Sequence, residues 1–161
     1  LPDCIVMNSP YDAFNPVWSV DPFFYSEKLK QYTNKLVYIP WFVTDEIDSE
    51  NPEDGKSFYN MRYYVTVPGI IHADYTIVQS EGMREAYLEK ISRFLEGEED
   101  LEENAGNADR IQRKEALLNR KDVLEQMEKK IIGAGSCLLG EKAGQGTKEV
   151  AEAFRKILEE L

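Results

Sequence analysis

Residues 75–94 constrain the fold more than any other part of the chain. The run from Tyr75 to Val78 is short, apolar and β-branched, which predicts a buried strand. Ser80 then offers a hydroxyl N-cap, and Glu81 places a carboxylate in the first helical turn, where the helix dipole favours an anion. An amphipathic helix is predicted as far as Phe94, with one face formed by Met83, Ala86, Tyr87, Lys90, Ile91 and Phe94. A strand, a polar corner and a helix form the building unit of a parallel α/β sheet.

Three other apolar runs predict the remaining strands, at residues 4–7, 36–39 and 130–132. Helices are predicted between the strands at residues 22–33, 58–67 and 108–129, and a last helix begins at Thr147. We therefore expect a single domain over residues 1–161, with a three-layer α/β fold and a mostly parallel sheet of about four strands. The acidic stretch at residues 96–107 repels itself and is expected to be a mobile insertion.

The composition excludes several classes of function. The formal net charge of −11 opposes binding to a nucleic-acid backbone, which needs clustered Lys and Arg. No run reaches the roughly 18 apolar residues of a membrane-spanning helix. The two cysteines, Cys4 and Cys137, form neither a disulfide framework nor a metal set, which fits a reducing, cytoplasmic compartment. The single histidine, His72, lacks a second base or a paired nucleophile, so we expect a structural role for it and neither Ser-His-Asp chemistry nor a zinc site. No cofactor is expected.

Polar or small residues follow the predicted strands. The carboxyl ends of parallel strands share one edge, where α/β sheets bind ligands, so we expect these residues to lie on one rim. The candidate ligand-binding residues are Asp12, Trp41, Gln79, Ser80, Gly133, Gly135 and Ser136. Ser80 with the amides behind it, and the glycine corner at Gly133, are suited to an anionic group such as a phosphate. No catalytic residue can be singled out, because carboxylates occur throughout so acidic a chain.

Two features of the sequence keep alternatives open. Gly133 and Gly135 after a strand form a fragment of a dinucleotide fingerprint, but the third glycine is not in place and a tight turn is favoured. The loop after the first strand carries Tyr11, Phe14 and Trp18. These aromatic side chains either pack the loop down, which is the favoured interpretation, or line a pocket.

A series of motifs runs through the chain as far as Glu81. They are Pro2-Asp3-Cys4-Ile5-Val6, Asn8-Ser9-Pro10-Tyr11-Asp12, Ser19-Val20-Asp21-Pro22, Leu36-Val37-Tyr38-Ile39-Pro40-Trp41-Phe42, Pro68-Gly69-Ile70-Ile71, Ala73-Asp74 and Val78-Gln79-Ser80-Glu81. In this order they resemble a bacterial group related to CDP-glycerol glycerophosphotransferases and, more broadly, the amino-terminal half of GT-B glycosyltransferases.

The resemblance implies a Rossmann-like half of a GT-B fold, with residues 131–136 as the strand before the linker to a second, nucleotide-donor half. It implies a transferase that moves glycosyl or glycerophosphate units during cell-surface polymer assembly. The partners would be a nucleotide-activated donor and a polymer acceptor, engaged through the second half, and peripheral membrane association stays open for the parent protein. The chain starts at Leu1-Pro2 and soon enters a strand. We therefore expect a fragment that supplies acceptor-side surface and does not catalyse alone.

The chain also departs from the family pattern. Relatives usually carry Gly-Ser-Pro-Lys-Phe-Asp where this chain has Gly135-Ser136-Cys137-Leu138-Leu139. Two rival functions therefore stay open. The charged helix around residues 111–127 and the acidic surface favour a non-catalytic module that binds a protein partner. Gly133 and Gly135 alone would support a small nucleotide-binding protein.

Overall fold

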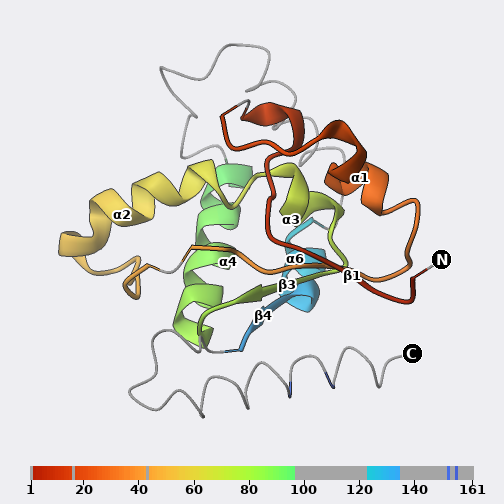
Figure 1. The fold of residues 1–161 in the computed structure, drawn as a ribbon. Helices are drawn as coiled ribbons and strands as arrows, with labels where there is room; N and C mark the ends of the chain where they lie inside the picture. Colours follow the sequence, from red (N-terminus) through yellow and green to blue (C-terminus); the bar gives the residue numbers. More distant parts are fainter. Residues whose placement is uncertain are drawn as a thin grey trace.

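The fold is a four-stranded parallel sheet with helices packed against it (Figure 1), seen in a computed structural model. The structure describes residues 2–15, 17–42, 44–96 and 123–134, together with Glu152 and Arg155. The strands lie in the order β1-β2-β3-β4, and every neighbouring pair is parallel. Their bounds are β1 (Ile5–Met7), β2 (Leu36–Tyr38), β3 (Tyr75–Val78) and β4 (Ile131–Gly133). The predicted α/β class and parallel sheet are therefore confirmed.

The spatial order of the strands is the same as their order along the chain. In a doubly wound sheet of the usual order 3-2-1-4-5-6, the strands follow chain order outward on each side of a switch point. The four described strands follow one another in a single direction, so no switch point lies among them. The helices are α1 (Ser26–Leu29), α2 (Gly55–Asn60), α3 (Pro68–His72), α4 (Glu81–Glu96) and α6 (Val123–Lys130), with short 3-10 turns η1 (Asp12–Phe14), η2 (Pro22–Phe24), η3 (Pro52–Asp54) and η4 (Met61–Tyr63).

Successive strand residues point to opposite faces of the sheet and bury apolar side chains on both. Leu36, Tyr38 and Val78 join the main core with side chains from α1, α3, α4 and α6. Val37 and Ile77 belong to a second cluster, where they are 0% and 3% exposed. This alternation is the period of two expected for strands. The described helices contribute to the main core, whereas the second cluster consists of residues from the strands and their immediate neighbours.

The predicted strand-corner-helix unit is present, and its helix runs to Glu96, two residues past the predicted end. β3 ends at Val78 and α4 begins at Glu81. The hydroxyl of Ser80 accepts a hydrogen bond from the amide of Met83 at 2.9 Å, so Ser80 caps α4 as predicted. The face predicted to be apolar is the buried one: Met83, Ala86, Tyr87, Lys90, Ile91 and Phe94.

The helix predicted at residues 22–33 is wrong in extent and orientation. η2 ends at Phe24, and the chain then turns extended before α1 starts at Ser26. The Asp21 carboxylate caps the amide of Phe23 at 2.9 Å, which closes a short turn. Phe23 and Phe24 are 57% and 54% exposed instead of forming a buried face.

The helix predicted at residues 58–67 is wrong at both ends. α2 begins at Gly55 and passes into η4, which ends at Tyr63. Val67 precedes Pro68 and is extended, with ψ 154°. A residue before proline avoids the helical region for steric reasons, so the helix cannot run on to Val67.

Several predictions lie outside the described residues. They concern the insertion from residue 97 on, the charged helix before Val123, Gly135, Ser136, and most of the last helix, of which only Glu152 and Arg155 are described, both helical and exposed. Among the described helices, none combines the length and the apolar character needed to cross a bilayer.

Candidate functional site at the carboxyl edge of the sheet

The carboxyl ends of β3 and β4 meet in a tightly packed corner. A Cβ added to Gly133 would lie 2.5 Å from the carbonyl oxygen of Ser80 and 2.6 Å from the amide nitrogen of Glu81. Only glycine allows an approach this close between the end of β4 and the start of α4. Two of the predicted site residues, Ser80 and Gly133, are therefore brought into contact.

The loop after β2 returns to the same corner, where Thr44 and Glu46 form hydrogen bonds with the polar side chains of Gln79 and Ser80. The amide group of Gln79 donates to the carbonyl of Thr44 at 2.7 Å and accepts from its N–H at 3.2 Å. The carboxylate of Glu46 accepts from the Ser80 hydroxyl at 2.6 Å and from Gln79 at 3.1 Å. The anion at the amino end of α4 is thus the protein's own Glu46, and a phosphate at Ser80 would have to displace it.

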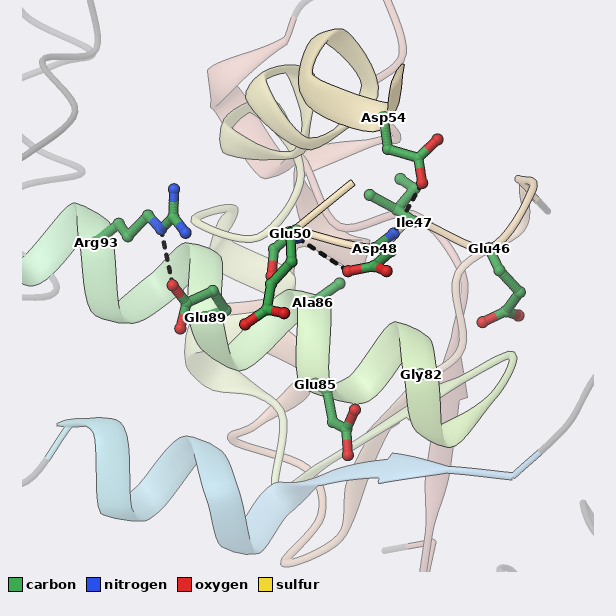
Figure 2. A pocket seen from close by; sticks show the side chains of 11 residues that line it. Glu46, Ile47, Asp48, Glu50, Asp54, Gly82, Glu85, Ala86, Glu89 and Arg93 are labelled. Carbon is green, nitrogen blue, oxygen red and sulfur yellow. Dashed lines mark hydrogen bonds and ion pairs between the residues drawn. The ribbon is translucent and has the colours of Figure 1, made fainter. Parts of the chain in front are cut away.

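An acidic cavity of about 650 Å³ lies between this loop and α4 (Figure 2). Six carboxylates line it, and Arg93 is its single basic side chain, held by Glu89 at 2.7 Å. The lining residues are Glu46, Ile47, Asp48, Ser49, Glu50, Asp54, Gly82, Glu85, Ala86, Glu89 and Arg93. In the part of the chain that the structure describes, no three acidic, His or Cys side chains are grouped so that they could hold a metal ion.

Part of this acidity has a structural explanation within the loop. The Asp48 carboxylate accepts the amide of Glu50 at 2.9 Å, and the Asp54 carboxylate accepts the amide of Asp48 at 3.1 Å. Such side-chain acceptors replace regular backbone pairing in turns. Two of the six carboxylates therefore shape the loop that forms the cavity wall.

Asp12 is buried and is anchored to α1. It is 6% exposed and adopts a left-handed φ of 47°. Its carboxylate accepts the amide of Ser26 at 2.8 Å and the Ser26 hydroxyl at 2.6 Å. It therefore caps α1, which explains why that helix starts at Ser26. The predicted rim position of Asp12 is replaced by an internal structural contact.

The hydroxyl of Ser26 also contacts His72, with its oxygen 2.7 Å from Nδ1. A carboxylate can only accept, so Ser26 donates to Asp12 and the Nδ1–H of His72 donates to Ser26. In a nucleophilic triad the histidine stands between the serine and the carboxylate, whereas here the serine stands between them and is 0% exposed. The cluster therefore does not have the order of a nucleophilic triad, and the structural role of His72 stays a prediction.

Sequence reasoning missed Ser26, and no local signal marks it. Its partners lie 14 and 46 residues away along the chain. Burial raises the pKa of the thiol of Cys4, the described cysteine, which disfavours its nucleophilic thiolate form.

Trp41 is the predicted site residue with the most open surroundings. It follows β2, is 51% exposed and lies with its ring centroid 5.6 Å from that of Trp18, which is 58% exposed. A second cavity, of about 440 Å³, is lined by Val6, Met7, Asn8, Ile39, Pro40 and Trp41. The aromatic residues of the loop after β1 therefore have different surroundings. Tyr11 packs against the core, whereas Trp18 contacts Trp41 beside the cavity.

Comparisons with family models, with curated proteins and with solved structures find no significant match to this chain.

Proposed function

We propose that this chain is part of a GT-B-type transferase that moves a glycosyl or glycerophosphate unit during cell-surface polymer synthesis in the bacterial cytoplasm. In this proposal the chain supplies the acceptor-side wall of an interdomain cleft. A nucleotide-activated donor and the catalytic groups belong to a second half of the parent protein.

The sheet topology is the observation that carries the proposal. Four parallel strands in sequential order bring their carboxyl ends to one edge of a Rossmann-like α/β sheet. Sheets of this class bind ligands outside the carboxyl ends of their strands. At that edge, Trp41 is half-exposed beside a cavity, and the corner of Ser80 and Gly133 is packed shut.

The contacts at this edge support different roles for the predicted residues. Trp41 would meet the ligand. Gln79 and Ser80 would shape the wall through their hydrogen bonds to Glu46, and Gly133 through its close approach to Ser80 and Glu81. Asp12 would act only as a cap within the fold. Ligand contact by Gly135 and Ser136 stays a prediction. The Ser80 hydroxyl beside the Glu46 carboxylate also serves as the N-cap of α4, which favours a structural use of this pair and a surface role for the chain.

The proposal is tested by comparing the isolated chain with the product of its complete reading frame. We expect the 161-residue chain to show neither hydrolysis nor transfer with CDP-glycerol or nucleotide sugars. The complete product should contain a second α/β half downstream and should transfer from one of these donors. Turnover by the isolated chain would contradict the proposal.

The acidic cavity favours one alternative, a non-catalytic module that binds a basic segment of another protein. Six carboxylates around one arginine would attract clustered Lys and Arg. A reading frame that closes near Leu161, with no second half, would support this module and remove the transferase.

A further inference from the structure

The two tryptophans form an exposed aromatic surface beside an uncharged cavity. Trp18 and Trp41 are 58% and 51% exposed, and their ring planes are inclined by 31°. The cavity next to Trp41 is lined only by uncharged residues, in a chain of which 30% is charged. Exposed apolar side chains grouped around a cavity mark ligand-binding surfaces in soluble proteins.

The indole ring of Trp41 is held in place by the fold before any ligand binds. Trp41 contacts Phe42 edge-on, and Phe42 contacts Tyr64, which in turn lies against the buried Tyr87. This row of rings connects the surface indole to the main core. Trp41 is therefore positioned by packing and does not have to be ordered when a ligand arrives.

The backbone of Trp18 is held by its own loop. The backbone amide of Trp18 donates to the Asn15 side chain at 3.2 Å, and its carbonyl accepts from the Ser9 hydroxyl at 3.3 Å. Ser9 follows β1 by two residues, so the Trp18 loop is fastened to the carboxyl end of that strand. The backbone is satisfied, while the indole ring stays on the surface.

Polar groups around the cavity suit hydroxyl-bearing ligands. Asn8 lines the cavity with an exposed amide that both donates and accepts. Within the described residues, neither this amide nor the indole N–H groups of Trp18 and Trp41 have a protein partner. An apolar wall with a few polar groups is the usual composition of a small-molecule site.

We infer that the Trp18–Trp41 surface and the adjoining cavity bind the ring of an uncharged carbohydrate. The apolar C–H face of such a ring stacks on an indole, and its hydroxyls bond to Asn8 and the indole N–H groups. An anionic ligand finds no cationic side chain in the lining, and the net charge of −11 repels it. A cationic ligand meets no carboxylate there. The inference deepens the proposed function by naming the chemistry of the acceptor surface, and it rests on that proposal only for its biological meaning.

Intrinsic fluorescence provides a direct test, because the chain contains two tryptophans and both lie at this surface. Glucose, N-acetylglucosamine and cellobiose are titrated into the isolated chain. We expect at least one of them to change tryptophan emission saturably and to shift both indole N–H resonances in NMR. The expected Kd is on the order of 1 mM, as for a single small ring with few polar contacts.

Variants separate stacking from general effects on the fold. Trp41→Ala should weaken saccharide binding roughly tenfold or more, with Trp18 as the remaining reporter, and Trp41→Phe should retain part of the affinity. Phe23→Ala is the matched control, since Phe23 is also an exposed aromatic residue, at 57%, but pairs with Phe24. It should leave the affinity unchanged. Circular dichroism confirms that each variant is folded.

Three outcomes would overturn the inference. The first is an absent or non-saturable response to all three saccharides, or one that Trp41→Ala leaves intact. The second is a response to cytidine or glycerol 3-phosphate with none to the saccharides. The third is a ligand-free, concentration-dependent change in emission together with dimerisation, which would assign the surface to a second copy of the chain. Turnover by the parent protein is read separately, so failure of the transferase proposal and failure of saccharide binding are distinguishable.

Discussion

At the scale of single residues, Gly133 shows how one missing side chain permits the packed corner at the carboxyl edge. Alanine at this position would place a methyl group within 2.6 Å of the backbone of Ser80 and Glu81. Backbone atoms at the start of a 16-residue helix cannot move aside as a flexible side chain can. We therefore predict that Gly133→Ala lowers the free energy of unfolding by about 1–3 kcal/mol, the usual cost of overpacking.

Gly55→Ala is the matched control for this prediction. Gly55 begins α2 in a helical conformation, and a Cβ added there meets no atom within 4 Å. Alanine should stabilise the chain by about 0.4–1 kcal/mol, because it restricts the unfolded backbone. Urea denaturation followed by circular dichroism measures both changes. Equal stability of the two variants would show that β4 does not press against the corner in solution.

At the scale of elements, Lys130 connects the end of α6 to the carboxyl end of α3. Its ammonium group donates to the carbonyls of Ile70, Ile71 and Ala73 at 2.5, 3.0 and 3.2 Å. Cations favour helix carboxyl ends, where carbonyls lack helical partners. We predict that Lys130→Met lowers the free energy of unfolding by about 1.5–3 kcal/mol, the range for hydrogen bonds to a charged group.

Lys129→Met removes the same charge from the neighbouring position. Lys129 pairs with Glu125 on the surface of α6, with its side chain 72% exposed, and exposed pairs contribute about 0–1 kcal/mol at most. Chemical denaturation of the two variants should therefore separate them. A similar loss in both would mean that Lys130 does not hold α3 and α6 together.

Elements with strong local signals could be predicted from the sequence. β3 and α4 were predictable because a β-branched run, a serine cap and helical spacing all agree within residues 75–94. The helix predicted at 22–33 failed because its true start depends on Asp12, a cap supplied from 14 residues away. Helical spacing of Phe23 and Phe24 could not reveal this distant partner.

The candidate site was predictable only in outline. Parallel strands placed Ser80 and Gly133 at one corner, as their positions after strands suggested. That Glu46 would occupy the end of α4 could not be predicted, because its position depends on how a long acidic loop folds back. The contact of Trp18 with Trp41 likewise joins two loops that share no sequence signal.

At the scale of the whole molecule, the core is rich in tyrosine, and this makes stability depend on pH in the alkaline range. Burial raises the pKa of Tyr64 to about 12, and it raises the pKa values of Tyr38 and Tyr87 further. An unfolded phenol ionises near its ordinary pKa of 10.0. The contribution of these protonated tyrosines to stability is thus fully present below about pH 10. It is lost as the pH rises through their pKa values in the folded protein. We predict cooperative unfolding between about pH 10 and 12, with loss of the far-ultraviolet circular dichroism signal.

Tyr38→Phe tests whether ionisation of the core causes this unfolding. The Tyr38 hydroxyl is buried without a hydrogen-bond partner among the described residues, so its removal costs no hydrogen bond at neutral pH. The variant lacks one buried phenol and should unfold at a higher pH. Tyr32→Phe, at a position that is 39% exposed, is the control and should leave the midpoint unchanged. If Tyr38→Phe also left the midpoint unchanged, alkaline unfolding would have to originate outside the tyrosine core.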